Sequence, residues 1–447
     1  MTSGSSQPLP SSTLHGYHTA AQFPVSALDE TMGAMLSHSL SPREASVRRS
    51  VRRWATDVLA PVVAKNWEQG TFPFECLPSF AALNIGGGAI YGTERLSLMG
   101  LAMVAVELAR VDASFATFYL VHCGLAMESI AACANDEQQQ RLLRPMSRMK
   151  KIGCFGLTEP HFGSDATSLE TVARPCEDGR DGVLLYGAKR WIGNATFADI
   201  IVCWARHSER GEIGAYVIEV DRASSSMPPG LRIEKIEGKV SLRITQNADL
   251  YFDGVFVPRS NILDAVPTNF RLGQGLPEVL EASRILVAWL PVGVCMGAFD
   301  LTLRYLKERQ QFGTPLAAFA ISQEKLARMA GSIMAMWTLC ERLTLTFRQQ
   351  QQQQQQLQIS MPHVTMTKAW TTRTGRECLA LARELLGGNG IVLDFGVAKA
   401  FCDLEALYTY EGTYEINALV AGRFLTGIAA FKAPTAGIQS AQKRAKL

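Results

Sequence analysis

The sequence predicts an α+β protein in three parts: an N-terminal helical domain, a middle antiparallel β domain and a C-terminal four-helix bundle. Three changes along the chain predict this order. Apolar residues recur at helical spacing from Ser41 to about residue 149, short runs rich in Val, Ile, Tyr and Trp follow as far as Pro258, and long helical periods return beyond Gln274. The chain has 447 residues, of which 47% are hydrophobic and 19% charged, so it can bury a large core.

We expect domain boundaries at residues 39–154, 155–268 and 269–432. Residues 1–38 are rich in Ser, Pro, Thr and His, a composition typical of a disordered tail. Residues 433–447 are expected to form a second tail, which ends in a targeting signal.

The N-terminal domain is expected to begin with a helix from residue 42 to about 66. Ser41 and Glu44 match a capping box, and Pro42 occupies the first helical position, where its missing N–H has no partner to lose. Gly86 to Gly88 are expected to form a turn between helices. Further helical periods cover residues 96–111, 115–134 and 137–149.

The middle domain is expected to be a small antiparallel sheet, because its β-rich runs are separated by turn dipeptides at Asp181-Gly182, Arg210-Gly211 and Asp253-Gly254. The glutamine tract from Gln349 to Gln356 is predicted to be a solvated loop or a helix extension, and we assign it no function. Four long helical periods predict the C-terminal bundle, at residues 277–309, 323–349, 362–386 and 414–430.

Charge excludes two classes of partner. Lys and Arg number 44 and Asp and Glu 41, so the net charge of +3 provides neither a basic stripe for nucleic acid nor a cationic surface for a membrane. The longest apolar run, Ile285 to Phe299, contains Pro291 and falls short of the roughly 20 residues of a membrane span, so we interpret it as a core helix. The N-terminus lacks the pattern of a secretory signal.

Cysteine and histidine usage predicts no metal site. The ten cysteines are dispersed and include no Cys-x-x-Cys pair, which argues against a zinc site and is typical of a reducing compartment. His15 and His18 lie three residues apart without acidic or cysteine companions, and we interpret their spacing as coincidence.

Four segments carry residue types suited to binding or chemistry, and each also has an ordinary structural interpretation. Residues 156–165 are dense in hydroxyls and glycines, so they either line a cofactor or form a helix-to-strand loop. In residues 189–194 an indole beside a bare glycine either stacks on a flat ring or belongs to the core. The glycines of residues 385–390 either cap a helix or let a phosphate approach the backbone, and an acid such as that in residues 410–413 usually complements a helix dipole.

The joint order of these segments is highly specific, because from about residue 41 to residue 431 the chain closely resembles the acyl-CoA dehydrogenase and oxidase superfamily. Two further features, Arg110-Val111-Asp112-Ala113-Ser114 and the ending Ala445-Lys446-Leu447, make the plant-type peroxisomal short-chain acyl-CoA oxidases the most similar group, which is related to glutaryl-CoA dehydrogenase. The motifs that carry the resemblance are Gly156-Leu157-Thr158-Glu159-Pro160 with Gly163-Ser164-Asp165, Lys189-Arg190-Trp191-Ile192-Gly193-Asn194, Arg309-Gln310-Gln311-Phe312-Gly313, Gly387-Gly388-Asn389-Gly390 and Tyr410-Glu411-Gly412-Thr413.

The resemblance implies an acyl-CoA dehydrogenase-like fold with FAD between the β domain and the bundle. Thr158 is implied to hydrogen-bond the pyrimidine edge of the flavin, Ser164 to contact both FAD and acyl-CoA, and Trp191 to pack along the isoalloxazine. Further implied FAD contacts are Leu157, Gly163, Ile192, Gly193, Glu384 and Thr413.

The resemblance also implies that the active unit is a homo-oligomer, expected to be a tetramer. Arg309 and Gln323 match positions that reach the FAD of a neighbouring subunit, and Gly387 and Gly388 match positions that approach it.

For the substrate, the resemblance implies contacts from Ser164, from Arg284, from Gly412 beside the thioester and from Phe431 near the CoA. Glu411 is the candidate base, which removes the α proton while the β hydride leaves for the flavin, giving a trans-2-enoyl-CoA. An α carbon is a poor acid, so the carboxylate must be desolvated and the thioester oxygen must meet hydrogen-bond donors. In the family these donors are a ribityl hydroxyl of the flavin and the amide of the base residue.

Three positions depart from the patterns of related enzymes. Ala116 stands where glutaryl-CoA dehydrogenases carry an arginine for the distal carboxylate, which favours plain acyl chains. Gly193 stands where many dehydrogenases have a threonine near flavin N5, which is consistent with access of oxygen to the reduced flavin. Glu384 replaces the glutamine that some members have beside the glycine pair.

We therefore expect a FAD-dependent acyl-CoA oxidase that converts short-chain acyl-CoA to trans-2-enoyl-CoA and reduces O2 to H2O2 in peroxisomal fatty-acid β-oxidation. Ala445, Lys446 and Leu447 form a conservative variant of the Ser-Lys-Leu address, which predicts binding to the peroxisomal import receptor and a location in the peroxisomal matrix. One alternative is an acyl-CoA dehydrogenase that uses an electron-transfer flavoprotein. The other, of a different class, is a non-catalytic acyl-CoA-binding scaffold.

Overall fold

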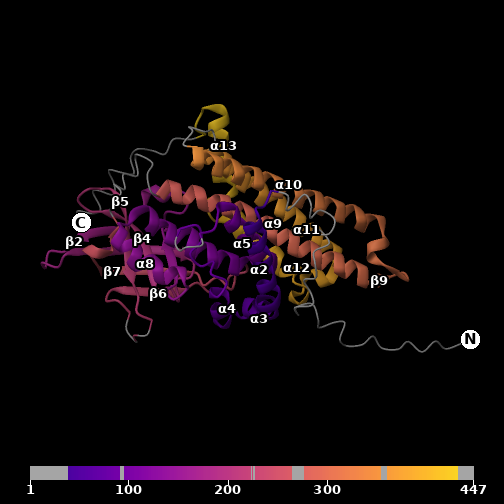
Figure 1. Ribbon diagram of the computed structural model, residues 1–447, viewed down its shortest axis with the longest axis horizontal. Coiled ribbons are helices and arrows are strands. Elements are labelled where there is room, and N and C mark those ends of the chain that lie inside the picture. Colours follow the sequence, from indigo (N-terminus) through magenta and orange to yellow (C-terminus); the bar gives the residue numbers. More distant parts are fainter. Residues whose placement is uncertain are drawn as a thin grey trace, which may run out of the picture.

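The computed structural model describes residues 39–90, 95–222, 224, 227–263, 276–353 and 360–430. The predicted tails at 1–38 and 433–447 and the substrate candidate Phe431 lie outside the described residues. The predicted order of helical, β and helical parts is confirmed. The strands of the large sheet gather at one end of an elongated molecule, the long C-terminal helices run toward the other end, and the N-terminal helices lie along the middle (Figure 1).

The N-terminal helices begin as the sequence predicts. The capping box before α2 (Pro42–Trp54) is present, with Ser41 N–H donating to Glu44 Oε2 at 2.8 Å and Glu44 N–H to Ser41 Oγ at 3.3 Å. The helix continues beyond the predicted end near residue 66, through a π-helical stretch (Ala55–Leu59) into α3 (Ala60–Gln69). Pro61 at the start of α3 has no N–H for the regular ladder, which accounts for the change of register.

A central helix, α5 (Leu98–Val111), is buried along most of its length and packs against α9 (Leu276–Glu308). Gly293 and Gly297 of α9 allow this close approach, because a Cβ at either position would overlap the carbonyl oxygen of Val106 or Arg110. The other helices of the N-terminal part are α4 (Leu77–Ala81), α6 (Ala113–Tyr119), which continues through a π-helical stretch (Leu120–Met127) into α7 (Glu128–Cys133), and α8 (Asp136–Ser147).

The sheet of the middle part is mostly antiparallel, as predicted, but it also contains two parallel pairs. Its strands are β1 (Gly153–Gly156), β2 (Val172–Pro175), β3 (Gly182–Ile192), β4 (Ile200–His207), β5 (Ile213–Glu219), β6 (Leu231–Lys235), β7 (Ala248–Pro258) and β8 (Ile262–Leu263), in the order β6-β7-β3-β2-β4-β5-β8 with β1 beside β4. β1 and β2 both pair with β4 in parallel, whereas the remaining pairs of this sheet are antiparallel. Four-residue strands such as β1 and β2 carry no sequence signal for their partner or direction.

Of the three turn dipeptides, two lie where predicted and one does not. Asp181-Gly182 lies at the start of β3, and Arg210-Gly211 lies between β4 and β5. Asp253-Gly254 instead lies within β7, where Gly254 has no partner in β3 and takes a left-handed φ of 72°. The dipeptide marks a β-bulge, which needs the same backbone freedom as a turn.

The C-terminal part contains one helix more than the predicted four. The predicted helices correspond to α9, α10 (Ala320–Gln353), α11 (Met361–Leu385) and α13 (Tyr414–Thr426), and a short hairpin of β9 (Gln310–Gln311) and β10 (Thr314–Pro315) follows α9. The additional helix α12 (Val397–Thr409) buries Lys399 and Asp403 beside Val397, Leu404 and Leu407, so charged residues conceal its apolar period. The glutamine tract extends α10 as far as Gln353.

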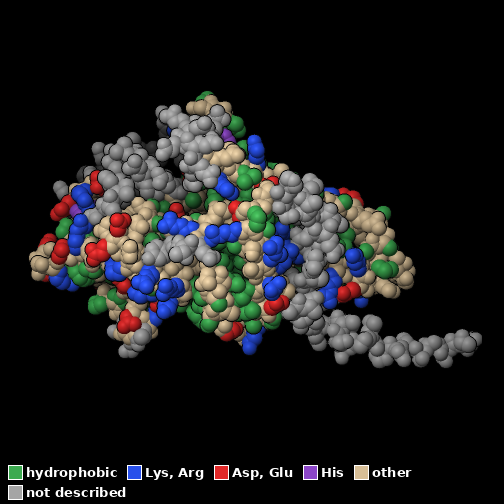
Figure 2. All heavy atoms as spheres, viewed as in Figure 1, with side chains coloured by type: hydrophobic (Ala, Val, Ile, Leu, Met, Phe, Trp, Pro, Cys, Tyr) green, Lys and Arg blue, Asp and Glu red, His purple; other side chains and the backbone are tan. Residues whose placement is uncertain are grey.

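Two hydrophobic clusters lie on opposite faces of the sheet. In β4, Ile200, Val202 and Trp204 pack with the helices, whereas Ile201, Cys203 and Ala205 belong to the second cluster. Two segments, Ala113–Cys133 and Val279–Glu308, are long and apolar enough to cross a membrane, but their most apolar windows are 78% and 100% buried inside the fold. The prediction that the Ile285–Phe299 run is a core helix is therefore confirmed. On the face that Figure 2 shows, basic and acidic side chains are interspersed.

Candidate active site

The first wall of the site is a loop that leaves the sheet between β1 and β2. The two strands lie end to end along β4, and residues 157–171 connect them. Two buried charged residues fix this loop: Lys189 Nζ donates to Leu157 O at 3.1 Å and to Glu159 Oε1 at 2.7 Å. Glu159 also accepts the N–H groups of Glu170 and Thr171, at 2.6 and 2.9 Å. The glutamate of this motif therefore shapes the loop and leaves ligand contacts to its neighbours.

Several groups of this wall are available to a ligand. The Thr158 and Ser164 hydroxyls make no hydrogen bond within the described part of the chain, and a Cβ added to Gly163 would meet no atom within 4 Å. Trp191 at the end of β3 is 50% exposed, so the alternative of a core tryptophan does not apply. Ile192 is buried, and only its backbone can face a ligand. The wall thus offers a flat apolar surface beside free hydroxyls and bare backbone, which fits a planar ring with a polar edge.

The second wall is the base loop, residues 410–413, which joins α12 to α13. Glu411 has a left-handed φ of 53° and Gly412 follows at 84°. A left-handed backbone at a glutamate costs about 1–3 kcal/mol and persists only where the surroundings enforce it. Glycine suits position 412 because a side chain is strained at this φ, and its Cβ would also lie 3.0 Å from Asn417 Nδ2. Thr413 caps α13 by accepting the Ile416 N–H at 3.3 Å.

Helix α9 supplies two partners for Glu411. Ser283 Oγ donates to the Glu411 carboxylate at 3.3 Å, and Arg284 Nε donates to the Glu411 carbonyl at 3.0 Å. Burial raises the pKa of the Glu411 carboxyl, and Arg284, Lys368 and the Ser283 hydrogen bond oppose this rise only in part. A carboxylate with a raised pKa is a stronger base, which is what proton removal from carbon requires.

The N-terminal part closes this side of the site. Thr117 Oγ1 of α6 lies 3.3 Å from Tyr410 Oη, one residue before the candidate base, and the adjacent Ala116 is fully buried. The N–H of Glu411 has no partner within the described part of the chain, so it is free to donate to a substrate oxygen.

The second set of predicted flavin contacts lies elsewhere on the chain. Arg309 precedes β9, at the end of the molecule remote from the sheet (Figure 1), and Arg309 and Gln323 are exposed. Gly387 and Gly388 are exposed too, and a Cβ added to either would meet no atom within 4 Å. Gly387 has a left-handed φ of 58° directly after α11, so it also serves as the helix-ending glycine. Within one chain, Arg309 therefore lies at the opposite end from the sheet that carries Trp191, and the predicted contact of these four residues with a neighbour's FAD stays a prediction.

Glu384 has a partner that the sequence did not indicate. Its carboxylate accepts from Lys325 Nζ of α10 at 2.8 Å, and this hydrogen bond lowers its pKa. Sequence reasoning assigned no role to four buried polar residues: Glu159 and Lys189, which lie inside the motifs, and Ser283 and Lys368, which lie outside them. Only the position of Ser283 beside Arg284, and that of Glu159 and Lys189 inside the motifs, could have indicated them.

Metal ions are not indicated at this site, because the described residues contain no group of three or more His, Cys, Asp or Glu side chains placed to bind one. All ten cysteines are free. The site instead combines a shielded carboxylate with an exposed indole and free hydroxyls. Such groups are suited to an enzyme that removes a proton from carbon beside a planar redox cofactor.

The comparisons identify the family. Acyl-CoA dehydrogenase models match the N-terminal domain at residues 41–150, the middle domain at 154–255 and the C-terminal domain at 276–426. The chain belongs to the acyl-CoA dehydrogenase family, whose members bind FAD.

Similar proteins carry dehydrogenase names. Cyclohex-1-ene-1-carbonyl-CoA dehydrogenase of Geobacter metallireducens is 29% identical, over 84% of this chain and 96% of its own. The mitochondrial short-chain specific acyl-CoA dehydrogenase of Bos taurus is also 29% identical, over 85% and 89%. Among solved structures, glutaryl-CoA dehydrogenase of Mycobacterium smegmatis has a TM-score of 0.81 at 30% identity, with 90% of this chain and 99% of that chain covered. A second structure of that enzyme, in complex with FADH2, has a TM-score of 0.80 at 28% identity, with 91% and 99% covered.

Proposed function

We propose that this enzyme introduces a trans double bond between the α and β carbons of short, uncharged acyl-CoA thioesters, with Glu411 as the base. The observation that carries the proposal is the position of Glu411, a carboxylate with a raised pKa in a constrained loop, hydrogen-bonded by Ser283. FAD, when bound, accepts the two electrons of the reaction. The free N–H of Glu411 is suited to meet the thioester oxygen, on which negative charge develops as the proton leaves.

The preference for an uncharged chain rests on Ala116. The glutaryl-CoA dehydrogenase structures resemble this chain in fold, but Ala116 offers no cation to a distal carboxylate. Ala116 is fully buried, and an unpaired carboxylate in such surroundings is strongly disfavoured. The similarity to a short-chain specific dehydrogenase supports the same preference.

The electron acceptor distinguishes two candidate functions. The names of the relatives favour a dehydrogenase that passes electrons to a carrier flavoprotein. An oxidase that reduces O2 to H2O2 in the peroxisomal matrix is the second candidate, favoured by Gly193 and by the terminal Ala445-Lys446-Leu447, an address that lies outside the described residues. A Cβ at residue 193 would lie 3.4 Å from methyl groups of Val121 and Thr245.

One experiment tests both levels of the proposal. The purified yellow enzyme is mixed anaerobically with butyryl-CoA, and bleaching of the flavin absorbance is followed, with glutaryl-CoA as the comparison. Failure of butyryl-CoA to bleach the flavin would remove the proposed reaction and leave the scaffold alternative. Air is then admitted: recovery of the yellow colour with one H2O2 per turnover supports the oxidase, whereas recovery only with a carrier flavoprotein supports the dehydrogenase. Enrichment of the labelled protein in peroxisomes, lost on removal of residues 445–447, tests the location.

A further inference from the structure

A buried lysine supports the base loop from inside the bundle. Lys368 of α11 is fully buried, and its Nζ donates to the carbonyl oxygens of Tyr410 and Gly412, both at 2.7 Å, with Tyr408 O further away at 3.4 Å. The proposed reaction uses no group of this residue. An ammonium that donates its hydrogen bonds to backbone carbonyls holds the backbone in place. Here the carbonyls of Tyr410 and Gly412 lie on either side of Glu411 in the chain.

Every carbonyl of the base loop accepts a hydrogen bond from a side chain. Lys368 donates to the carbonyls of residues 410 and 412, and Arg284 donates to that of residue 411 at 3.0 Å. Asn417 Nδ2 donates to the carbonyls of residues 412 and 413, at 2.7 and 3.0 Å. Such a complete set of bonds can enforce the left-handed backbone of Glu411, which would otherwise relax.

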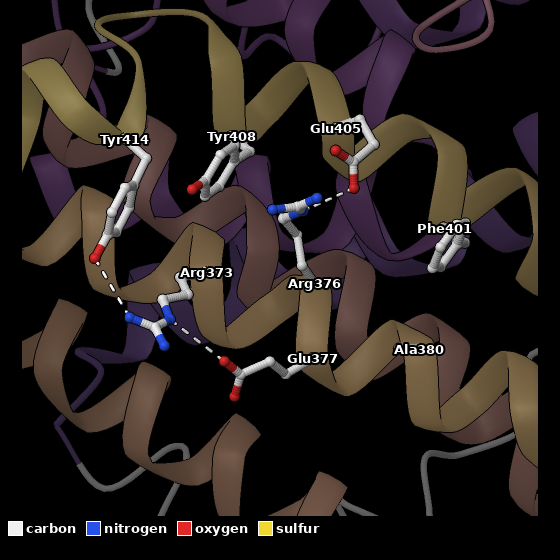
Figure 3. Close-up of a pocket in the computed structure, with 8 residues that line it drawn as sticks. All are labelled: Arg373, Arg376, Glu377, Ala380, Phe401, Glu405, Tyr408 and Tyr414. Atoms are coloured by element: carbon white, nitrogen blue, oxygen red, sulfur yellow. Dashed lines mark hydrogen bonds and ion pairs between the residues drawn. The ribbon is translucent and has the colours of Figure 1, made fainter.

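The outer face of the same loop is closed by aromatic rings. Tyr408 and Tyr414, which flank the loop, stack with centroids 5.3 Å apart and planes 8° apart. Arg376 lies over Tyr408 at 4.4 Å and Arg373 approaches the Tyr414 hydroxyl at 3.5 Å, beside a hollow of about 370 Å³ (Figure 3). Both arginines are paired, with Glu405 and Glu377 respectively. The two arginines that line the hollow are therefore not free to bind a ligand.

The charge of Lys368 also acts on Glu411. Burial lowers the pKa of Lys368 to about 7, and the Glu411 carboxylate opposes that effect. In return, Lys368 acts together with Arg284 to limit the rise in the pKa of Glu411. The charged groups around Lys368 are Arg284 of α9, Glu411 of the loop and Glu415 of α13.

We propose that Lys368 is a positioning residue for Glu411: the hydrogen bonds from its Nζ to the flanking carbonyls hold the base in its left-handed backbone. The inference rests on the proposed role of Glu411 as the base. It adds a residue that touches neither substrate nor cofactor and yet sets the orientation of the group that does.

The test uses the FAD-loaded enzyme with Lys368→Met, which keeps the length of the side chain and removes the ammonium. We expect the rate of anaerobic flavin bleaching by butyryl-CoA to fall about 100-fold, the effect of a small misplacement of a catalytic group. We expect the acid limb of its pH profile to move upward by about one pH unit, because an opposite charge near the carboxylate has been lost. Amides of residues 409–414 are expected to exchange faster with deuterium, with FAD still bound.

Two further variants separate this role from general loss of stability. Leu379→Ala removes a fully buried side chain of the same helix without touching the base loop, and it is expected to leave the acid limb and the loop exchange unchanged. Lys368→Arg keeps the charge and is expected to retain the wild-type acid limb, so it decides the question if Lys368→Met does not fold.

The outcomes are distinguishable. An unchanged acid limb and unchanged loop exchange in Lys368→Met would overturn the inference. So would a shifted acid limb with faster loop exchange in Leu379→Ala, or a shifted acid limb in Lys368→Arg. If wild-type enzyme is not bleached by any acyl-CoA, the proposed function fails instead. Deuterium exchange of residues 409–414, which needs no substrate, then still decides whether Lys368 holds the loop.

Discussion

Lys399→Met would test how the three parts of the fold are joined. The Lys399 ammonium of α12 lies between two buried carboxylates, that of Asp112, with which it forms an ion pair, and that of Asp403 at 2.8 Å. Asp112 caps α6 through the Phe115 N–H, at 2.6 Å. Asp403 accepts from Trp67 Nε1 of α3 at 2.8 Å and from the N–H of Leu242 in the middle part at 2.7 Å. One lysine thus joins two buried carboxylates in a cluster to which all three parts contribute.

Loss of this ammonium leaves two carboxylates buried together. Burial by itself lowers the pKa of Lys399, but Asp112 and Asp403 outweigh it and raise that pKa, so the lysine is charged throughout the neutral range. Breaking a buried ion pair by removing one partner typically costs about 3–5 kcal/mol. We expect Lys399→Met to lose about that much free energy of unfolding. Methionine fills the volume, so lost packing accounts for little of the effect.

Thermal unfolding of the FAD-loaded protein, followed by circular dichroism and flavin fluorescence, measures the effect. Lys307→Met provides the control, because Lys307 is an exposed lysine of α9 and such substitutions usually change stability by less than about 0.5 kcal/mol. The deficit of Lys399→Met should shrink as the pH falls. Burial raises the pKa of Asp112, and protonation of a carboxyl with a raised pKa relieves the uncompensated charge. The reasoning is refuted if Lys399→Met is as stable as Lys307→Met at neutral pH.

Three further predictions concern the base, acid stability and helix packing. Glu411→Gln should keep FAD but slow flavin bleaching by about 10²–10⁴-fold, and unchanged rapid bleaching would contradict the assignment of Glu411 as the base. Wild-type activity should fall as acid protonates Glu411 at a pH above 4.5, since the pKa of this carboxyl is raised. Burial opposes ionisation of Glu107, but Arg52 and Arg48 lower its pKa from 4.5 to about 2. At about 1.4 kcal/mol per tenfold change, this shift contributes about 3 kcal/mol of stability above pH 4.5, which is lost as the pH falls toward 2. Urea midpoints of unfolding that do not fall between pH 5 and 3, or that fall equally in Glu107→Gln, would contradict this prediction. Gly297→Ala should destabilise the protein by at least about 1–3 kcal/mol, because its Cβ would overlap a carbonyl of α5, whereas Gly331→Ala in α10 meets open space and should be neutral or stabilising in the same melts.

Local patterns were sufficient to predict much of the helical structure. The capping box at Ser41 and Glu44 is present, and the long helices of the bundle lie close to their predicted ranges. These features depend on residues within a few positions of one another, so the sequence contains them directly. Helix α12 was missed because its buried face includes Lys399 and Asp403, whose partners lie on other elements.

The sequence by itself determined the order of helical and β parts, and its motifs indicated the family and the candidate base. Tertiary structure decided which strands pair in parallel, since β1 and β2 find β4 only after the chain has folded back. It also decided the environment of Glu411, because the pKa of a carboxylate depends on burial and on charges that α9 and α11 bring from more than forty residues away in the chain. The motif identifies the glutamate, whereas its raised pKa depends on burial and on neighbours that only the folded chain brings together.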